Sequence, residues 1–491
     1  MIARPRRARS TTGRSAVLVV LAVLVACAVV AAGITSTARP HDRSAVATDA
    51  AGPADPAGPV DPAARDARAA GGTLVVSSPD DPAVRLSTRP PQQSVPLLTL
   101  VEPVTVDPAT SGQTWTGVGA ALTDSAVAHL EDRPDLVRLL LDPAAAQGAR
   151  LQWLRLPLSA TDFSTQTWGW RVRDGRVVPG PQARRTLRFL REQVLPIDRG
   201  VRLVATPWSA PPRFKVRRTW FGSSLRDDAV ASYADFLVGQ VRWLREHRFP
   251  VRALTLANEP GLAERYPTML VSDAQLSRLA RLVGPRVDAL GVDLWALDHN
   301  WSDVARARTA LRDAPGAHAA VAFHCYAGVP AQAAGLEVPW LVDECTGTDD
   351  SAVGTLDWDS RVLVDQSVDA GSTGLLMFNL ALSPGERGAF GGCGTCRGLL
   401  TVDGDASYAE PELYVLAHLS RAARRGSTVV GVSGPLDVVS AGFRRRDGSV
   451  GVYGYNRSDR DRYLRLQVDG TDGRVFRIGP HEVFTWSSGT G

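Results

Sequence analysis

The chain has almost no lysine. Lys215 is the only one, so nearly all of the 55 basic residues are arginines. We interpret this bias as a property of the coding genome and not as a functional signal. An excess of charge is also missing, since removing the five arginines of residues 1–14 from the formal net charge of +4 leaves −1 for residues 15–491. A nearly neutral body offers no basic face, so neither nucleic acid nor an anionic membrane surface is expected as a partner.

Cysteine is scarce as well, with five residues in 491. Zinc binding is disfavoured because His324 is the only histidine near any of them and the cysteines form two widely separated pairs. No ligand cluster for another metal is present, and no GxGxxG motif follows a predicted strand. We therefore expect no metal, no dinucleotide and no other cofactor.

Four of the cysteines can form disulfides if the chain is exported. Cys393 and Cys396 have redox-motif spacing, but they stand in a glycine-rich stretch without a βαβ pattern, which favours a local structural disulfide. Cys325 and Cys345 each follow a candidate site residue at the ends of neighbouring predicted strands. Either a disulfide or two buried thiols is compatible with their placement.

Residues 1–34 are interpreted as a targeting segment. A basic stretch ends at Arg14, and the 19 residues from Ala16 to Ile34 carry no charge. This run is long for a signal peptide and just long enough to span a bilayer, so a cleaved signal and a retained anchor both stay open. Lipidation of Cys27, within a sequence that resembles a lipobox, is a third alternative. The chain is expected to be secreted, or anchored outside the cytoplasmic membrane by residues 16–34 alone.

The central part of the chain alternates short apolar runs with amphipathic segments. The amphipathic segments include Tyr233–Arg248, Gln275–Leu290 and, as the last helix, Leu413–Arg424. Continuous apolar strands indicate burial on both faces, and eight strand–helix units predict a (β/α)8 TIM barrel over residues 113–424. The predicted strands are Gly117–Ala121, Leu151–Leu158, Val201–Trp208, Ala253–Pro260, Val292–Asn300, Ala319–Tyr326, Pro339–Thr346 and Thr373–Leu382.

Two further segments predict an associated β-sandwich domain. Residues 35–72 are rich in Ala, Pro, Asp and Gly and predict a disordered linker. Short apolar stretches follow within residues 73–112, and short strands return in residues 425–491. We expect both ends of the barrel chain to build one β-sandwich. The predicted strands include Leu74–Val76, the stretch with Val95, Leu97, Leu98 and Leu100, and Val438–Phe443, Val450–Tyr455, Tyr463–Val468 and Glu482–Trp486.

Polar groups follow the apolar strands at a consistent position, which in a barrel is the rim where catalytic residues gather. Glu259 ends the fourth predicted strand and Glu344 the seventh. Two carboxylates across one cleft suit glycoside hydrolysis, in which one attacks the anomeric carbon and the other, kept protonated near neutral pH by burial and by its neighbour's charge, protonates the leaving oxygen. A separation of roughly 5–5.5 Å gives retention of configuration, and a wider gap gives inversion.

The chain resembles glycoside hydrolase family 30, which includes glucosylceramidase, in six motifs that occur in the family's order. They are Gly117–Asp124, Arg155–Ser164, Ala205–Pro212, Thr255–Pro260, Leu341–Cys345 and Phe378–Leu382. The resemblance implies a retaining β-glycosidase with Glu259 as acid/base and Glu344 as nucleophile. It also implies substrate-binding or supporting roles for Asp124, Trp208, Asn258, His324, Tyr326 and Asn379, with Tyr326 close to Glu344.

One residue departs from the glucosylceramidase branch, which has tryptophan where this chain has Phe378. Phenylalanine has no indole N–H donor, so strict glucosylceramide specificity is in doubt. Some site residues also have simpler interpretations: Asp124 could cap a helix as readily as bind sugar, and His324 could be a core histidine. Trp168 and Trp170 are interpreted as stacking platforms, with a loop anchor as the alternative.

Several functions remain open within these predictions. The leading one is hydrolysis of β-linked glycosides of the β-glucosidase, glucosylceramidase, β-1,6-glucanase or β-xylosidase type, with a β-linked glycoside or polysaccharide as the partner. The alternatives are a non-catalytic cell-surface carbohydrate-binding protein and a transglycosylase. Both candidate carboxylates are present, which favours catalysis over binding alone.

Overall fold

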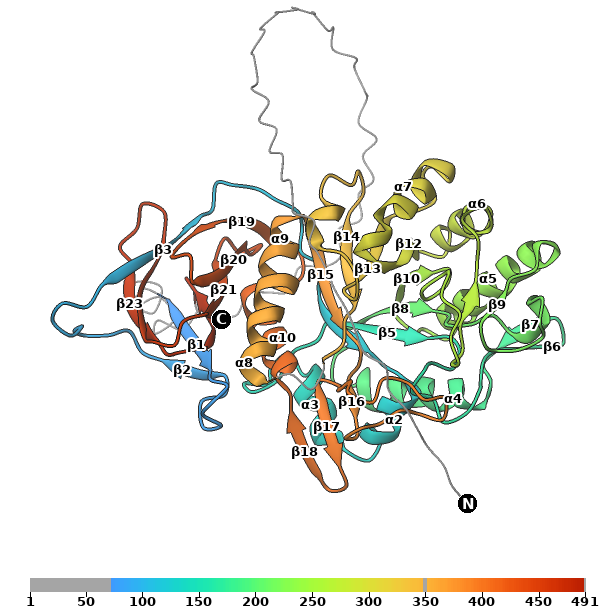
Figure 1. Ribbon diagram of the computed structural model, residues 1–491, viewed down its shortest axis with the longest axis horizontal. Coiled ribbons are helices and arrows are strands. Elements are labelled where there is room, and N and C mark those ends of the chain that lie inside the picture. The colour runs from blue at the N-terminus through green and yellow to red at the C-terminus, as the bar shows by residue number, and fades with distance from the viewer. Residues whose placement is uncertain (1–71, 348–350, 490–491) are drawn as a thin grey trace, which may run out of the picture. The chain divides into compact units, whose positions relative to one another are not determined.

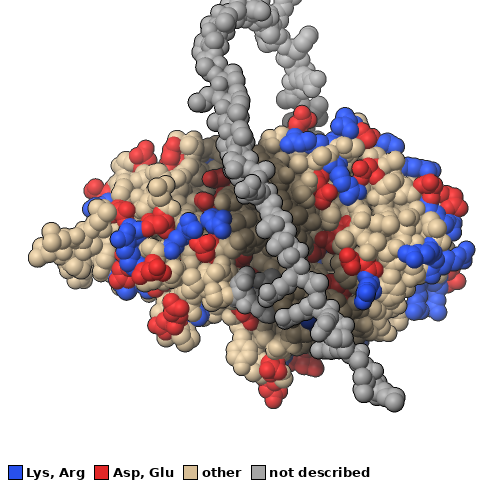
Figure 2. All heavy atoms as spheres, viewed as in Figure 1, with Lys and Arg blue, Asp and Glu red and all other residues tan. Residues whose placement is uncertain are grey.

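The computed structural model describes residues 72–347 and 351–489. The predictions for residues 1–34 and for the linker up to residue 71 lie outside these ranges. Within the ranges, no helix is both long and apolar enough to cross a membrane. On the face drawn in Figure 2, basic and acidic side chains are interspersed, and neither sign covers the face alone.

Eight parallel strands close into a barrel, in the order β10-β12-β13-β14-β15-β4-β5-β8 (Figure 1). Their side chains are almost wholly buried, because the barrel interior takes one face of each strand and the helices cover the other. The (β/α)8 prediction is confirmed. The strands are β4 (Gly117–Ala121), β5 (Trp153–Pro157), β8 (Arg202–Thr206), β10 (Val251–Thr255), β12 (Asp293–Asn300), β13 (Ala320–His324), β14 (Trp340–Glu344) and β15 (Ser372–Met377).

Helices follow the strands and pack their apolar faces on the barrel. Helix α6 (Asp273–Asp288) begins with a capping box, in which the Ser272 side chain accepts from the backbone of Gln275 and the Gln275 side chain accepts from the backbone of Ser272. The other helices are α2 (Asp124–Leu130), α3 (Pro134–Leu141), α4 (Pro181–Phe189), α5 (Val230–Glu246), α7 (Val304–Asp313), α8 (Ala352–Trp358), α9 (Ser367–Asp369) and α10 (Pro411–Ala422). A π-helical turn, Leu190–Val194, extends α4, and another, Asp359–Gln366, joins α8 to α9.

A second sheet system combines strands from both ends of the described chain, as predicted. Its order is β2-β1-β24-β21-β20-β19-β3-β22-β23, and its apolar faces enclose a core of their own. The strands are β1 (Thr73–Ser77), β2 (Ser87–Arg89), β3 (Val101–Asp107), β19 (Thr428–Ser433), β20 (Val438–Arg444), β21 (Val450–Asn456), β22 (Arg462–Val468), β23 (Arg474–Ile478) and β24 (Val483–Ser487). Short ladders outside both sheets are formed by β6 (Arg171–Arg173) with β7 (Arg176–Val178), β9 (Ser223–Ser224) with β11 (Met269–Leu270), and β16 (Ala381–Leu382), β17 (Leu400–Asp403) and β18 (Ala406–Ala409).

One predicted strand is wrong. The stretch around Val95–Leu100 forms no strand, and Leu97 and Leu98 are fully exposed. Pro96 lies within the stretch and has no N–H to give to a ladder, and Leu98 has a φ of 66°, outside the extended region. After β2, the chain therefore returns to the sheet only at Val101, where β3 begins.

Helix α10 ties the barrel to the second sheet system through a buried histidine. The ring of His418 lies 2.9 Å from the Thr485 hydroxyl on β24 and 3.0 Å from the Ser77 hydroxyl on β1. Burial, with a smaller contribution from the charge of Arg421, holds the pKa of His418 well below its usual range. His418 is therefore neutral and joins the two chain ends within one hydrogen-bond network.

Replacing His418 with leucine removes both ring contacts, so we expect the free energy of unfolding at pH 7 to fall by about 1–3 kcal/mol. The wild-type chain should also lose stability as the pH falls below the ordinary histidine range, because the unfolded chain then binds a proton that the folded chain refuses. Urea unfolding at pH 7 and pH 5 measures both effects. The difference in free energy of unfolding between His418→Leu and wild type should be smaller at pH 5 than at pH 7. The exposed-site control His247→Gln should show no such change.

Candidate active site

The carboxyl ends of four neighbouring barrel strands bring their polar side chains together. Asp298, His324 and Glu344 belong to β12, β13 and β14. Glu259 lies four residues beyond the end of β10, with a φ of 45°, and its N–H donates to the carbonyl of Asp298 at 2.9 Å. The predicted fourth strand, Ala253–Pro260, therefore ends too late, and a turn rather than the strand aims Glu259.

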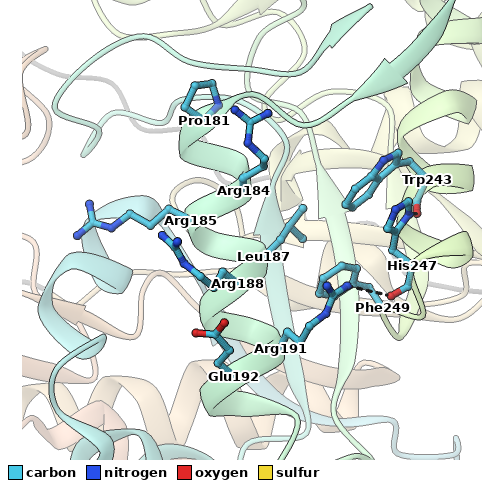
Figure 3. Close-up of a pocket in the computed structure, with 10 residues that line it drawn as sticks. All are labelled: Pro181, Arg184, Arg185, Leu187, Arg188, Arg191, Glu192, Trp243, His247 and Phe249. Atoms are coloured by element: carbon cyan, nitrogen blue, oxygen red, sulfur yellow. Dashed lines mark hydrogen bonds between the residues drawn. The ribbon is translucent and has the colours of Figure 1, made fainter. Parts of the chain in front are cut away.

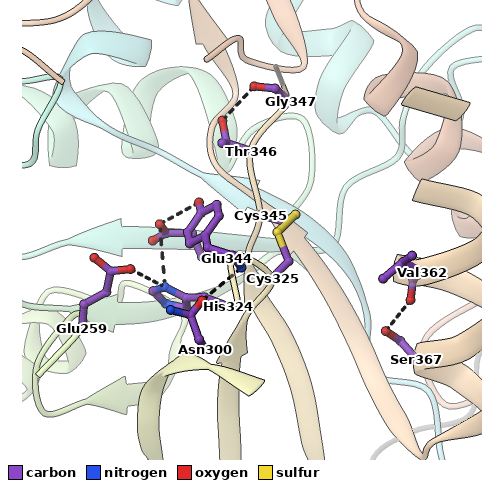
Figure 4. Close-up of a disulfide and its surroundings, with 11 residues drawn as sticks. Glu259, Asn300, His324, Cys325, Glu344, Cys345, Thr346, Gly347, Val362 and Ser367 are labelled. Carbon is purple, nitrogen blue, oxygen red and sulfur yellow. Dashed lines mark hydrogen bonds and ion pairs between the residues drawn. A yellow bond between two sulfur atoms is a disulfide. The ribbon is translucent and has the colours of Figure 1, made fainter. Parts of the chain in front are cut away.

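Glu259 and Glu344 face the same point from two sides of His324 (Figure 4). One oxygen of each carboxylate and a ring nitrogen of His324 all lie within 4.8 Å of one another. Both glutamates are largely buried, at 7% and 6% exposure. The nearest oxygens of the two carboxylates are thus at most 4.8 Å apart. This is compatible with the carboxyl spacing of retaining glycosidases, about 5–5.5 Å.

Irregular pairing between β13 and β14 aims the acids. The register shifts between Phe323 and His324, so that Asp343 is an extra residue in β14. Consecutive strand residues ordinarily face opposite ways, but a bulge can turn both to one side. As a result, both Asp343 and Glu344 reach the guanidinium of Arg155. A similar shift in β12 leaves Asp298 as the extra residue there.

Arg155 is the hub of this cluster. It lies on β5, is fully buried, and donates to Glu344, to Asp298 at 2.7 Å and to the amide oxygen of Asn258 at 2.7 Å. Burial lowers the pKa of Arg155, but the negative charges around it outweigh burial and raise it overall, so the side chain stays cationic. Arg155 was not among the site residues predicted from the sequence, although a charged residue inside an apolar strand was the available signal.

The acids of the cluster do not all carry charge. Burial and the neighbouring charge of Asp298 raise the pKa of Asp343 well above its usual range, so this carboxyl group is neutral. Burial raises the pKa of Asp298 as well, but the charge of Arg155 and the contacts with His324 outweigh burial and hold this pKa below its usual range.

Glu259 is not held protonated by burial, contrary to the sequence prediction. Burial raises its pKa, but the hydrogen bond from His324 and the positive charges nearby outweigh burial, and the net shift is downward. Burial lowers the pKa of His324, and the charge of Glu344 with hydrogen bonds to Asp298 and Glu259 raises it well above its usual range. The two shifts together favour the proton on His324, whose Nδ1 lies 3.2 Å from Glu259.

Two sets of side chains have the spacing of metal ligands. His324 belongs to both, with Glu259 and Glu344 in one and with Asp298 and Asp343 in the other. The Arg155 guanidinium already supplies a positive charge to Asp298, Asp343 and Glu344, and a divalent cation beside it and a protonated His324 would be repelled. Among the described residues, cationic side chains therefore already balance the acids of both sets. The absence of a metal stays a prediction.

Tyr326 lies beside Glu344, where the family resemblance placed it. Its hydroxyl donates to Glu344 Oε1 at 3.0 Å, and its backbone N–H donates to the side chain of Asn300 at 3.0 Å. Burial and the charges of Glu344 and Glu259 raise the pKa of Tyr326 well above its usual range. The phenol therefore stays a donor to Glu344.

Trp208 and Phe378 form an aromatic wall of the site. Their rings stack at 5.7 Å, and the Arg155 guanidinium lies 4.5 Å from the Trp208 ring. The next residue, Asn379, is fully buried, and its amide oxygen accepts from Ala381 at 3.1 Å. Its amide nitrogen has no hydrogen-bond partner among the residues that the structure describes, which leaves a donor available beside this wall.

Asp124 does not cap its helix, because Thr123 does so by accepting from the Ala126 N–H. The Asp124 carboxylate accepts from the Ser164 hydroxyl at 2.6 Å, and its role in sugar binding stays a prediction. The acid that sequence reasoning missed is Asp162 of the second motif. Burial and the charges of Glu344 and Glu259 raise the pKa of Asp162 to about 8, which places it within the electrostatic reach of both glutamates.

The two tryptophans of the loop after β5 are buried. Trp170 packs edge-on against Trp243 of α5, with 3% of its surface exposed. Its interpretation as a stacking platform is therefore wrong, and it anchors the loop. Trp168 donates to the Ser164 hydroxyl at 3.3 Å and supports the same loop that carries Asp162.

Lys215, the single lysine, lies fully buried behind the site. Its ammonium group donates to the Ser209 hydroxyl at 2.7 Å and to the carbonyls of Trp220 and Thr268 at 2.9 and 2.8 Å. Burial, with a smaller contribution from Arg217, lowers its pKa to about 7. All three ammonium protons are thereby used to join the loops after β8 and β10, and no polar substrate group can reach this amine.

A separate pocket of about 550 Å³ lies on the outer side of the barrel between α4 and α5 (Figure 3). Its walls include Arg184, Arg188 and Arg191 on one side and Trp243 with Phe249 on the other. It shares no residue with the cluster around Arg155, so we do not assign it to the candidate active site.

No family model matches the chain, whereas similar proteins are found by sequence and by structure. By sequence, it is 25% identical over 429 residues to endo-1,6-β-D-glucanase BGN16.3 of Trichoderma harzianum, a match that covers 78% of this chain and 86% of that protein. It is also 25% identical over 405 residues to mouse lysosomal acid glucosylceramidase, covering 73% of this chain and 78% of that one.

Solved structures share the fold. The endo-β1,6-glucanase BT3312 superposes with a TM-score of 0.76 at 19% identity, covering 85% of this chain and 99% of that one. SrfJ from Salmonella typhimurium superposes with a TM-score of 0.76 at 22% identity, and the match covers 86% of this chain and 100% of that one. The catalytic domain of GH30 xylanase C from Talaromyces cellulolyticus gives 0.63 at 19% identity, covering 79% and 99%.

A closed barrel with buried carboxylates at the ends of its strands, together with these relatives, defines an O-glycosyl hydrolase that acts on β-linked glycosides. The resemblance to glycoside hydrolase family 30 that the six motifs predicted is confirmed.

Replacing Arg155 with methionine should lower the free energy of unfolding by about 3–5 kcal/mol at pH 7.5, because buried carboxylates lose their counterion. In the wild-type chain the lowered pKa of Asp298 gives stability that is present above the ordinary aspartate range and is lost as the pH falls. The variant lacks this contribution, so the difference in free energy of unfolding between the two should stay nearly constant down to about pH 4 and shrink only below the ordinary aspartate range, as measured by urea unfolding.

The matched control is Arg185→Met, which breaks a partly exposed pair with Glu131. Because such pairs contribute roughly 0–1 kcal/mol, this variant should unfold almost as the wild type does. Equal losses in both variants would contradict the role of Arg155 as the hub.

Proposed function

We propose that the chain cleaves β-glycosides by double displacement, with Glu344 as the nucleophile and Glu259 as the acid/base. The observation that carries the proposal is the separation of at most 4.8 Å between one oxygen of Glu259 and one of Glu344. Carboxylates this close favour direct attack by one of them over the wider spacing, roughly 6.5–9.5 Å, that leaves room for a water in an inverting enzyme. The Tyr326 hydroxyl and the Arg155 guanidinium orient Glu344 for that attack.

In the first step a Glu344 oxygen bonds to the anomeric carbon while the bond to the leaving oxygen breaks and Glu259 supplies the proton to that oxygen. In the second step Glu259 takes a proton from water, and the water oxygen displaces Glu344. Glu259 must therefore hold a proton by the time the leaving oxygen departs, and the nearby proton of His324 is its source. The amide oxygen of Asn258 is held by Arg155, which leaves its amino group to donate to the sugar 2-hydroxyl.

The substrate that we propose is a β-1,6-linked glucan. Three curated relatives that match 67–78% of this chain are named endo-1,6-β-D-glucanases. Phe378, in place of the tryptophan of the glucosylceramidase branch, supports a substrate other than glucosylceramide. Trp208, Phe378 and the free amide donor of Asn379 are proposed to line the glycone subsite, with Asp162 added to the predicted Asp124.

The chain is proposed to act outside the cell. The basic and apolar N-terminal residues, the two disulfides, and the structural likeness to an exported protein from Bacteroides fragilis support this proposal. Attachment through residues 16–34 is one form of it and secretion is the other. We propose the domain division 73–112 and 425–491 for the β-sandwich and 113–424 for the barrel, with the sandwich bracing the barrel through α10.

Hydrolysis of aryl β-glycosides by full-length wild type, Glu344→Gln and Glu259→Gln tests the two roles. Glu344→Gln should lose more than about 10⁴-fold in kcat, because the nucleophile is gone. Glu259→Gln should lose about 10²–10⁴-fold on substrates with poor leaving groups and much less on dinitrophenyl glycosides, which need no proton. The control Glu264→Gln changes an exposed acid of the next loop and should retain full activity. Equal losses for all leaving groups in Glu259→Gln would disprove its acid role.

Stereochemistry and substrate class are tested with polymers. Proton NMR during cleavage of β-1,6-glucan should show the β-anomer as the first product, and an α-anomer would overturn the double displacement. Release of reducing ends from β-1,6-glucan but not from β-1,4-xylan or glucosylceramide micelles supports the proposed substrate. Products longer than the substrate would indicate transglycosylation, and binding without cleavage would indicate a carbohydrate-binding protein.

A further inference from the structure

A disulfide bridge stands directly behind the two strand ends that carry the site. Cys325 and Cys345 are bonded, with their Cα atoms 5.3 Å apart (Figure 4). Each cysteine is the first residue beyond its strand, so Cys325 follows His324 of β13 and Cys345 follows Glu344 of β14. The two alternatives of disulfide and free thiols are thereby decided in favour of the disulfide.

The backbone ladder between these strands is weak at this point. The shift that makes Asp343 an extra residue comes just before the last register pair, His324 with Glu344. Beyond that pair, one further backbone bond joins the segments, from the Cys325 N–H to the Glu344 carbonyl at 3.2 Å. A bulge interrupts pairing and leaves strand ends with few bonds to fix their spacing. The covalent bridge begins where the ladder stops.

The bridge does not touch the reacting groups. Side chains alternate along an extended strand, so Glu344 faces the mouth and Cys345 faces the helix layer. Cys345 is fully buried within the main apolar core, and Cys325 packs against the same core. The disulfide can therefore act on the site only through the backbone positions of the neighbouring residues.

Those positions set the contacts on which Glu344 depends. Tyr326 lies one residue after Cys325, and its hydroxyl reaches Glu344 Oε1 at 3.0 Å, across the gap that the disulfide spans. His324 lies one residue before Cys325 and is 3.2 Å from Glu259. A catalytic group must be held within about 0.5 Å of its productive position, so a small separation of the two strand ends breaks these contacts.

We propose that the Cys325–Cys345 disulfide is a positioning device that holds Tyr326 against Glu344 and makes turnover dependent on an oxidised bridge. The inference rests on the proposed role of Glu344 as nucleophile. Reduction by a dithiol such as dithiothreitol would transfer two electrons and two protons to the bridge, giving two cysteine thiols and a cyclic disulfide of the reagent. The chain would then stay folded but with a slower chemical step.

The double variant Cys325→Ala/Cys345→Ala tests the inference on an activated aryl glycoside. We expect kcat to fall roughly 10–100-fold with KM little changed, since a small misplacement near the chemistry has effects of this size. The comparison variant is Cys393→Ala/Cys396→Ala, which removes the other disulfide; because Cys396 packs with the Trp208–Phe378 wall, any effect of this variant should appear in KM while kcat is kept. Equal loss of kcat in both variants, or no loss in the first, would overturn the inference.

A double-mutant cycle separates positioning from general stability. Tyr326→Phe should lower kcat in the wild-type background and have almost no further effect in Cys325→Ala/Cys345→Ala, because the contact is already lost there. Additive losses in kcat would show that the disulfide acts independently of Tyr326 and would contradict the proposal.

Reduction of the wild-type chain covers the case in which the variant does not fold. Dithiothreitol is titrated, the freed thiols are alkylated and located by mass spectrometry, and kcat is measured at each step. Cys393 is exposed, so its bridge should open first without loss of kcat, and kcat should fall with the opening of Cys325–Cys345. If kcat instead falls as the Cys393–Cys396 bridge opens, the inference is overturned and the proposed function still stands. If untreated wild type cleaves nothing, the proposed function is overturned and the inference falls with it.

Discussion

The structure of the site depends on one buried guanidinium. Burying a charge without partners is prohibitively costly, so Arg155 requires the acids that surround it, and they in turn require Arg155. Arg155 and His324 face Glu259, Asp298 and Glu344, so acids outnumber cationic groups in this buried cluster. Such an excess suits a reaction whose transition state places positive charge on the sugar ring. The same electrostatic balance thus supports both the folded barrel and the proposed chemistry.

Regular strands alone could not assemble this group. Neighbouring residues on a strand face opposite sides, yet Asp343 and Glu344 both meet Arg155, and the extra residue in β14 is what permits it. Asp298 is likewise an extra residue in β12. The irregularities remove backbone bonds where the greatest positional accuracy is needed. The Cys325–Cys345 bridge compensates on the outer side of the wall, where it leaves the mouth free for a sugar.

The barrel and the two glutamates could be predicted because apolar periodicity and rim position are local signals. All eight predicted strands exist, and the second sheet does contain both chain ends. The stretch before Val101 was mispredicted because apolar content was given more weight than its prolines. Arg155 and Asp162 were missed because their roles depend on which distant acids the closed barrel brings near them, and sequence spacing does not record that. The charge of His324 depends in the same way on acids of β12, of β14 and of the turn after β10.

In the proposed double displacement, a resting proton on His324 would let a single site perform both steps. The charge of Glu344 favours that proton on His324. As Glu344 bonds to the sugar in this mechanism, that charge disappears, the imidazolium becomes more acidic, and its proton is drawn towards Glu259 at 3.2 Å. The acid therefore becomes stronger in proportion to the progress of nucleophilic attack. When water later releases Glu344, its charge returns and the proton is drawn back to His324, which restores Glu259 as a carboxylate. Burial alone would have fixed Glu259 in one protonation state, whereas coupling through His324 lets the nucleophile control it.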